Sequence, residues 1–450
     1  MRKPEFCSKI LVVCLPFILL AAGPALSKSR NFQENTESRL QWFRDAKLGI
    51  FIHWGIYSVY GIDESWSFYN GYISYEDYMK QLKGFSAEAY DPEKWAELFH
   101  QSGARYAVLT AKHHDGVALW PTKHSDLNIV EQTPAGRDLI APFCRALRKK
   151  GLKVGLYFSH LDWSHPDYPF FTKTKKRYEE DLDRWQRFLY FRQGQIEELA
   201  KNYKPDLFWF DGDWDFNAEK WDSKNIRDYI REILPGTIIN SRINGYGDYA
   251  TPEQGLPITR PKEQDWELCM TMNDSWGYQK TDKNYKTPNQ IIRIFIDCIS
   301  MGGNLLLDVG PKEDGTIPEE QVTILKALGI WIRKHAEAVY GTQEGLPPEY
   351  FYGPSTLSAD RQTIFLFLAH APRGPVVVKG LTNKIHRIRV VGLGTKLSWK
   401  VMGKPYWSNI PGLVYIDVPE DVLDKEVTVL ALLLDGPLRI YNKDEESSLP

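Results

Sequence analysis

Short apolar runs alternate with longer amphipathic runs from about residue 45 to residue 340. The apolar runs at 106–112, 153–159 and 207–211 are too short for helices, so they predict strands that are buried on both faces. The amphipathic runs between them, such as 92–101 and 137–150, predict helices. Polar residues repeatedly follow the predicted strands. This order is typical of a (β/α)8-type barrel, an α/β fold in which the C-terminal strand ends form the active-site face. One or two of the strands do not stand out in the pattern.

The pattern changes near residue 343. From there to the C-terminus the apolar runs are shorter, alternate with polar residues and are separated by Gly, Pro and Asn. Such runs predict antiparallel strands. We therefore expect two domains, a catalytic (β/α)8-like barrel at 28–342 and a C-terminal β-sandwich at 343–450.

The first 27 residues have the layout of a secretory signal peptide. A cationic start is followed by an apolar run from Ile10 to Ala22, and small residues surround Ala25-Leu26-Ser27. We expect cleavage near Ser27, export to a periplasmic or extracellular location, and no membrane contact after cleavage. Cleavage would remove two of the five cysteines, and the remaining three are too few for a disulfide framework.

Composition narrows the classes of function. The formal net charge of the 450 residues is −2, which argues against nucleic acid as a partner because such proteins usually carry a clustered basic excess. Neither a cofactor nor a metal ion is predicted, and the sequence makes no prediction of the oligomeric state. Aromatic residues make up 13% of the chain. Aromatic rings can pack against the apolar face of a sugar, although they also fill the cores of barrels.

Polar and aromatic residues gather at the ends of the predicted strands. Imidazole and amide groups can bond sugar hydroxyls, while indole rings pack on C–H faces, so this combination predicts a site for a pyranose ring. The predicted lining residues are His53, Trp54, His113, His114, Asp115, Tyr157, Trp209, Asp211, Arg242 and Asn304.

A metal site is the alternative interpretation of His113-His114-Asp115. Adjacent residues at a strand end point in different directions, unlike metal ligands at helical i, i+4 spacing. A metal-dependent hydrolase is therefore the less favoured reading of these three residues.

Hydrolysis of a glycosidic bond usually requires two carboxyl groups. Asp211 ends a buried strand, where a carboxylate is costly unless it is paired or used, so we predict that it is the nucleophile. The acid/base is expected on a later loop. Glu253 is the leading candidate, followed by Glu267, and then by Asp213 or Asp308.

Five segments in order resemble the α-L-fucosidases of glycoside hydrolase family 29. They are Phe51-Ile52-His53-Trp54-Gly55, Lys112-His113-His114-Asp115-Gly116, Gly155-Leu156-Tyr157-Phe158-Ser159, Trp209-Phe210-Asp211-Gly212 and Gly302-Gly303-Asn304-Leu305-Leu306-Leu307. The resemblance covers residues 39–340 and implies metal-independent, exo-acting hydrolysis of terminal α-L-fucose with retention of configuration. It matches Asp211 to the family nucleophile and Trp276 to an aromatic near the methyl group of the sugar. The residues that it matches to fucose-binding and supporting positions are His53, His113, His114, Tyr157, Trp209 and Arg242.

The sequence departs from the family on the loop after the first strand. Many members have a Glu-Trp pair there, whereas this chain has Glu64-Ser65-Trp66, so the resemblance does not by itself assign Glu64 to the sugar. The position of the acid/base varies across the family, which leaves Glu253 and Glu267 both open. Two alternatives to a fucosidase of fucosylated glycans also remain. One is the same chemistry on α-L-galactosides or sulfated fucan oligosaccharides, and the other is a catalytically silent carbohydrate-binding protein.

Overall fold

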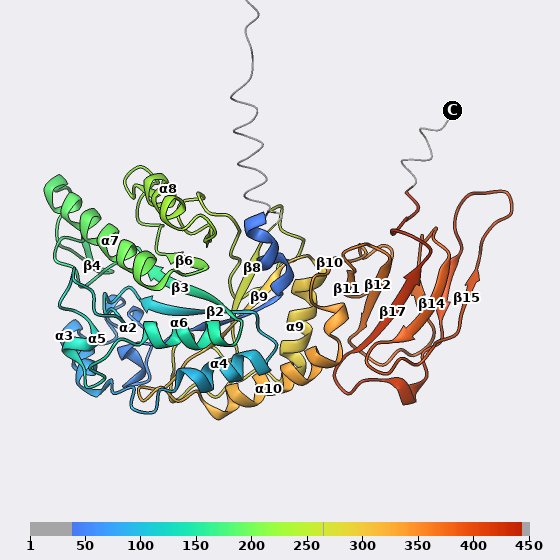
Figure 1. Cartoon of the computed structure of the whole chain (residues 1–450), viewed down its shortest axis with the longest axis horizontal. Helices are drawn as coiled ribbons and strands as arrows, with labels where there is room; N and C mark the ends of the chain where they lie inside the picture. Colours follow the sequence, from blue (N-terminus) through green and yellow to red (C-terminus); the bar gives the residue numbers. More distant parts are fainter. Residues whose placement is uncertain (1–37, 264, 443–450) are drawn as a thin grey trace, which may run out of the picture. The chain divides into compact units, whose positions relative to one another are not determined.

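The computed structural model describes residues 38–263 and 265–442. The expected signal peptide lies outside the described residues. A sheet of seven parallel strands curls through the N-terminal part, with the order β7-β6-β3-β2-β1-β9-β8 (Figure 1). Its strands are β1 (Leu48–Ile52), β2 (Tyr106–Lys112), β3 (Lys153–Ser159), β6 (Leu207–Asp211), β7 (Ile238–Ile239), β8 (Glu267–Thr271) and β9 (Asn304–Val309).

An irregular segment links the two edge strands of this sheet. Residues 249–253 make isolated parallel bridges, in which Tyr249 pairs with Asn240 just after β7 and Glu253 pairs with Cys269 in β8. The segment occupies the place of the strand that the sequence pattern does not reveal, because it has no apolar run of its own. The barrel prediction is confirmed in this form, as a curled parallel sheet whose edges are bridged by a non-regular segment.

Helices lie along the outside of the curled sheet (Figure 1). Among the described residues, the longer helices with both ends defined are α4 (Pro92–Gln101), α6 (Ile140–Lys149), α7 (Leu182–Tyr203), α8 (Ser223–Ile233), α9 (Pro288–Ser300) and α10 (Glu319–Lys334). Short elements lie in the loops: α2 (Trp66–Tyr69), α3 (Tyr75–Met79), α5 (Ile129–Gln132), the β4 (Phe170–Thr172) and β5 (Lys175–Lys176) hairpin, and 3-10 turns at Ile56–Ser58, Lys80–Gly84 and Ala336–Ala338.

Local sequence explains where the helices begin. Asp91 caps α4, accepting hydrogen bonds from the backbone of Glu93 and Lys94, and Pro92 occupies the first turn. Thr287 and Gln290 form a reciprocal capping box at the start of α9. The α7 helix begins at Leu182, where the Asp181 side chain accepts a hydrogen bond from the backbone of Arg184.

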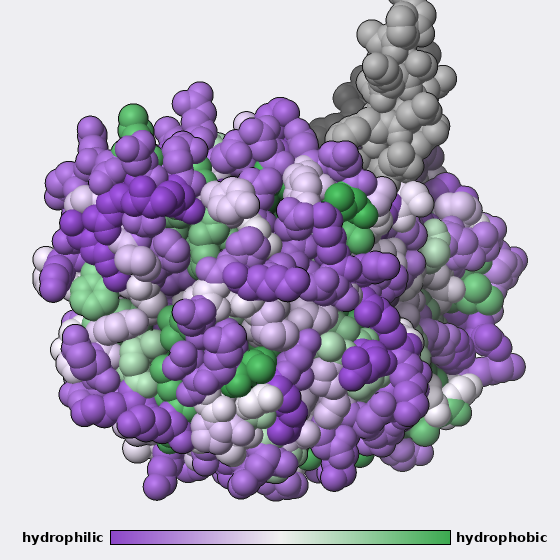
Figure 2. Space-filling view, turned by 60° about the vertical axis from the view of Figure 1, so that its left-hand side comes forward, coloured by the Kyte–Doolittle hydropathy of each residue, from purple (hydrophilic) through white to green (hydrophobic). Residues whose placement is uncertain are grey.

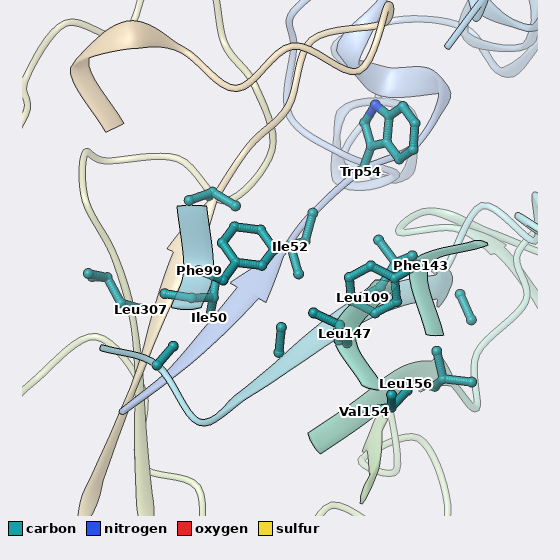
Figure 3. Packing of buried hydrophobic residues seen from close by; sticks show 14 of the residues in the cluster. Ile50, Ile52, Trp54, Phe99, Leu109, Phe143, Leu147, Val154, Leu156 and Leu307 are labelled. Atoms are coloured by element: carbon teal, nitrogen blue, oxygen red, sulfur yellow. The ribbon is translucent and has the colours of Figure 1, made fainter. Parts of the chain in front are cut away.

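Side chains of the parallel strands alternate between two hydrophobic layers. Ile50 and Ile52 of β1 pack outward with Phe99 of α4, and Leu109 of β2 packs with Phe143 and Leu147 of α6, as Figure 3 shows. The residues of opposite parity form a second cluster inside the curl; it includes Phe51, Tyr106, Val108, Tyr157, Leu207, Trp209, Cys269 and Leu306. Parity along a strand therefore decides whether a side chain faces the interior of the barrel or the helices.

The C-terminal part consists of two antiparallel sheets. A five-stranded sheet has the order β10-β11-β12-β17-β14, and a three-stranded sheet has the order β13-β16-β15. The strands are β10 (Gln343–Glu344), β11 (Ser355–Leu357), β12 (Thr363–Leu368), β13 (Val376–Val378), β14 (Ile385–Val390), β15 (Trp399–Met402), β16 (Leu413–Ile416) and β17 (Thr428–Leu434), with a 3-10 turn at Glu420–Val422.

One hydrophobic cluster joins these two sheets. It contains Leu366 and Leu430 of the larger sheet and Val378 and Ile416 of the smaller one. The sheets therefore pack face to face as a sandwich, as the alternating pattern predicts. The domain boundary expected at residue 342 stays a prediction.

The face shown in Figure 2 is largely hydrophilic, with hydrophobic residues visible in places between the hydrophilic ones. Within the described residues, no helix is both long enough and apolar enough to span a bilayer.

Candidate active site

A small pocket opens at the C-terminal ends of the parallel strands. Its volume is about 120 Å³, well below the roughly 300–1,000 Å³ of sites for drug-sized ligands, and it suits a single sugar ring. It is lined by Phe51, His53, Glu64, Trp66, His113, His114, Tyr157, Trp209, Asp211, Trp214, Arg242, Glu253, Cys269 and Trp276. A larger depression of about 1180 Å³ is lined by side chains from the 169–222 part of the sequence, and none of the predicted site residues lines it.

Asp211 is held at the end of β6 by two donors. The Tyr157 hydroxyl donates to Oδ2 at 2.9 Å, and Nη1 of Arg242 donates to Oδ1 at 3.0 Å. Nε2 of His114 lies 3.7 Å from Oδ2. The carboxylate is therefore fixed in orientation inside the pocket, and only 8% of the residue is exposed.

Arg242 connects Asp211 with Glu253. Its Nη2 donates to Oε2 of Glu253 at 2.6 Å, while Nη1 bonds Asp211, so one guanidinium contacts both carboxylates. The guanidinium carbon of Arg242 lies 4.6 Å from the ring centre of Trp209, so the indole ring stabilises the guanidinium by a cation–π contact. The Glu253 side chain is 40% exposed, so it can reach both the pocket and solvent.

Three histidines line the pocket, each with its Nδ1 atom bonded to a different partner. Nδ1 of His53 lies 2.7 Å from Oδ1 of Asp308, and Nδ1 of His114 lies 2.6 Å from the hydroxyl oxygen of Ser159. Burial lowers the pKa of His53, His113 and His114 well below the ordinary value of 6.5. Neutral imidazoles can both donate to and accept from sugar hydroxyls, so the site is suited to an uncharged polyol.

The His113-His114-Asp115 segment does not converge on one point. Asp115 accepts from the Tyr78 hydroxyl and from the backbone of Val117, and it does not line the pocket. Within the part of the chain that the structure describes, no group of three or more His, Cys, Asp or Glu side chains is arranged to hold a metal ion.

Trp54 is not in the pocket, contrary to the sequence-based prediction. Its ring packs 5.2 Å from Phe85, 5.0 Å from Tyr90 and 5.1 Å from Trp95, and its Nε1 donates to the Lys312 carbonyl. The physical reason is parity. Phe51 and His53 face the interior, so Ile52 and Trp54 face the helices (Figure 3).

Glu267 does not line the pocket either. It projects into the closed interior of the barrel, where its carboxylate accepts hydrogen bonds from the Tyr106 hydroxyl and, at 3.0 Å, from Nε1 of Trp209. The remaining candidates have structural roles as well: Asp308 orients His53, and Asp213 accepts from the Asn244 backbone. Of the four acid/base candidates, Glu253 alone shares the pocket with Asp211.

The pocket also contains residues that the sequence analysis did not assign. Phe51, Trp66, Trp214 and Cys269 belong to it, and so does Glu64, which the resemblance left open. The backbone N–H of Gly277 donates to Oε1 of Glu64, and burial raises the pKa of Glu64 to about 7. Trp214 could have been predicted from the sequence, because it follows Asp211 by only three residues.

We expect the buried Glu267 carboxyl to make the free energy of unfolding depend on pH. Burial raises its pKa from 4.5 to about 7. A raised folded-state pKa means that protonation favours the folded protein, so its contribution is complete below pH 4.5 and is lost as the pH rises through 7. Replacing Glu267 with Gln should remove this loss, about 3 kcal/mol in the free energy of unfolding.

Urea unfolding at pH 5 and pH 8 would measure this effect as the difference between wild type and variant. Glu93→Gln, at an exposed position, is the matched control and should leave the pH dependence as it is. An identical pH dependence in wild type and Glu267→Gln would contradict the assignment of a buried, proton-binding Glu267.

The chain is similar to known alpha-L-fucosidases. A family model described as alpha-L-fucosidase matches residues 21–337. The tissue alpha-L-fucosidase of Mus musculus is 31% identical over 393 residues, which cover 80% of this chain and 84% of the relative. The plasma alpha-L-fucosidase of Rattus norvegicus is 29% identical, with 91% of this chain and 95% of the relative covered.

Solved structures agree with the sequence comparisons. Alpha-L-fucosidase isoenzyme 1 from Paenibacillus thiaminolyticus superposes with a TM-score of 0.81 at 33% identity, covering 89% of this chain and 100% of that one. A family 29 alpha-L-fucosidase from Bacteroides thetaiotaomicron, trapped as a covalent intermediate with 2-fluoro-fucosyl fluoride, has a TM-score of 0.79 at 28% identity, covering 89% of this chain and 96% of that one.

Proposed function

The chain belongs to the α-L-fucosidase family, and from that premise we propose that it removes terminal α-L-fucose from fucosylated glycans with retention of configuration. The observation that carries the proposal is the pair of carboxylates on one guanidinium, with Asp211 and Glu253 both bonded to Arg242 inside a pocket sized for one sugar ring. Retaining glycosidases use two neighbouring carboxyl groups of this kind. The trapped covalent intermediate of the Bacteroides relative supports a mechanism through a fucosyl-enzyme.

The first half of the reaction forms the fucosyl-enzyme. Asp211 attacks the anomeric carbon and forms an ester bond to it, while protonated Glu253 donates its proton to the glycosidic oxygen as that bond breaks. The leaving group departs as a neutral alcohol. Tyr157 and Arg242 hold the attacking carboxylate in place, which reduces the entropic cost of reaching the transition state.

The second half returns the enzyme to its starting state. Glu253, now a carboxylate, removes a proton from a water molecule whose oxygen attacks the anomeric carbon. The ester bond to Asp211 breaks, α-L-fucose leaves, and Glu253 again carries the proton. Exposure of the Glu253 side chain, at 40%, gives this residue access to water and to the leaving group in turn.

The neutral histidines and the indole rings bind the sugar in this proposal. His53, His113 and His114 contact hydroxyl groups, while Trp276, whose ring centre lies 4.9 Å from that of His53, packs on an apolar edge. Glu64 joins them as a further hydroxyl acceptor or donor, because it lines the same pocket.

Hydrolysis of p-nitrophenyl α-L-fucoside by residues 28–450, followed by proton NMR, tests the proposal. We expect nitrophenol release, with α-L-fucose as the first anomer to appear and β-L-fucose only after mutarotation. The α-L-galactoside is the comparison substrate, and a chelator-treated sample should keep full activity. First appearance of the β anomer would contradict retention, and loss of activity with the chelator would favour the metal-dependent alternative.

Export is a separate proposal that rests on the layout of residues 1–27. N-terminal sequencing of the protein recovered from its native host, with Lys28 expected as the first residue, would test it.

A further inference from the structure

The connection between β15 and β16 carries two aromatic side chains that are almost fully exposed. Tyr406 is 95% exposed and Trp407 is 75% exposed. Figure 1 shows this connection as a long loop that extends beyond the neighbouring strands of the smaller sheet. We define residues 400–411 as the hairpin tip. It belongs to the C-terminal sandwich and contributes no residue to the pocket that contains Asp211.

Exposed aliphatic side chains accompany the aromatic pair. Val401, Met402 and Ile410 are each about half exposed, so both faces of the hairpin present apolar atoms to solvent. Single exposed hydrophobic residues are common on protein surfaces, but five exposed hydrophobic residues within ten positions of one hairpin are typical of an interaction site. No member of the group belongs to the hydrophobic cluster that joins the two sheets, so the core of the sandwich does not explain them.

The charged residues of the hairpin tip have one sign. Residues 400–411 contain Lys400 and Lys404 and no Asp or Glu, and Lys396 precedes them, while Asp417 accepts from the Ser398 hydroxyl at the base of the hairpin. All three lysines are exposed. The lysines of this surface would attract a negatively charged partner, and the exposed Trp and Tyr side chains would pack into an apolar part of it.

The geometry of the Tyr406 and Trp407 rings favours some classes of partner over others. Tyr406 and Trp407 lie 4.8 Å apart with their planes at 87°, so they do not form one flat platform on which successive sugar rings could stack. A second copy of this tip would bring like charges together, which disfavours self-association. An anionic lipid surface fits both features, because Trp and Tyr favour the interface between headgroups and acyl chains, and lysines are attracted to anionic headgroups.

We propose that the hairpin tip docks the protein peripherally on membranes that contain anionic lipids, with Tyr406 and Trp407 entering the interface and Lys400 and Lys404 contacting headgroups. This contact does not require a spanning helix. It would revise the sequence-based expectation of no membrane contact after signal cleavage. It does not depend on the assignment of Asp211 and Glu253, because the hairpin tip contributes no residue to the pocket.

Vesicle co-sedimentation tests the proposal with residues 28–450, because the apolar run at 10–22 would bind lipid by itself. The vesicles are phosphatidylcholine alone and phosphatidylcholine mixed with phosphatidylglycerol. We expect binding to the mixed vesicles that weakens with salt and is lost in Tyr406→Ser/Trp407→Ser. Lys400→Gln/Lys404→Gln should lose roughly fivefold in partitioning for each lysine. Release of nitrophenol from the aryl fucoside should be the same in all variants.

The matched control is Tyr190→Ser/Ile330→Ser, which removes two exposed hydrophobic residues from α7 and α10 and should bind vesicles as the wild type does. No binding to either vesicle would overturn the proposal, and so would binding that the aromatic substitutions leave unchanged. Binding to dextran sulfate that depends on Trp407, without vesicle binding, would assign the tip to an anionic polysaccharide. A dimer in sedimentation that Tyr406→Ser/Trp407→Ser abolishes, again without vesicle binding, would assign it to a second copy of the chain.

Discussion

Asp211→Gly is expected to abolish turnover of fucosides, with a loss in kcat on the order of 10⁴-fold or more, because the variant has no group to form the covalent intermediate. The acid/base, the histidines and the indole rings remain in place, so substrate should still bind. Nitrophenol release from the aryl fucoside measures the loss. A thermal unfolding scan shows whether the variant is folded, since Tyr157 and Arg242 each lose a hydrogen-bond acceptor.

External azide distinguishes a missing nucleophile from a disturbed site. Glycine leaves room beside the anomeric carbon, so azide can attack from the face that Asp211 occupied and give β-L-fucosyl azide, of inverted configuration. We expect partial recovery of nitrophenol release with azide in Asp211→Gly. The same azide should not rescue Asp213→Gly. If Asp213→Gly were inactive and gave the fucosyl azide while Asp211→Gly did not, the nucleophile would have to be reassigned.

The second large effect is expected at Glu253, and it should depend on the leaving group. Glu253→Ala removes the proton donor, so glycans with a poorly departing sugar alcohol should lose on the order of 10²–10⁴-fold in kcat/KM. α-L-Fucosyl fluoride needs little protonation to depart, so formation of the fucosyl-enzyme from it should be much less affected. Stopped-flow measurement of that step and steady-state assays on a fucosylated oligosaccharide give the two values.

Glu267→Gln provides the matched comparison for Glu253. Its carboxylate supports Trp209 from inside the barrel and lines no part of the pocket, so any loss should be of similar size for both substrates. A strong dependence on the leaving group in Glu267→Gln, with none in Glu253→Ala, would reverse the assignment of the acid/base.

The regular elements of the N-terminal part could be predicted from the sequence because their signals are local. The runs at 106–112 and 153–159 coincide with β2 and β3, and α4 coincides with the helix predicted at 92–101. The bridging segment at 249–253 could not be found in this way. Its pairing with Asn240 and with β8 depends on neighbours outside the segment, and it has no apolar pattern to announce a strand.

The strands of the parallel sheet also conceal which of their side chains face inward. Both faces of such a sheet are covered, so both parities are apolar and the usual alternation is missing. His53 and Trp54 therefore look equally suited to the pocket in the sequence, although the fold directs only His53 into it. Glu267 is ambiguous for the same reason. The residues around a carboxylate do not reveal whether it lies inside the barrel or in the pocket at the strand ends.

By itself, the sequence determined the alternating barrel architecture, the C-terminal sandwich, the carboxylate at the end of β6 and the family resemblance, since all of these lie in local patterns and ordered motifs. Tertiary structure alone decided that Glu253 and not Glu267 joins Asp211, that Trp54 belongs to the core, and that Glu64 enters the pocket. The physical reason is that these outcomes depend on side-chain direction and on contacts such as that between Arg242 and Glu253, which form only when distant strand ends meet.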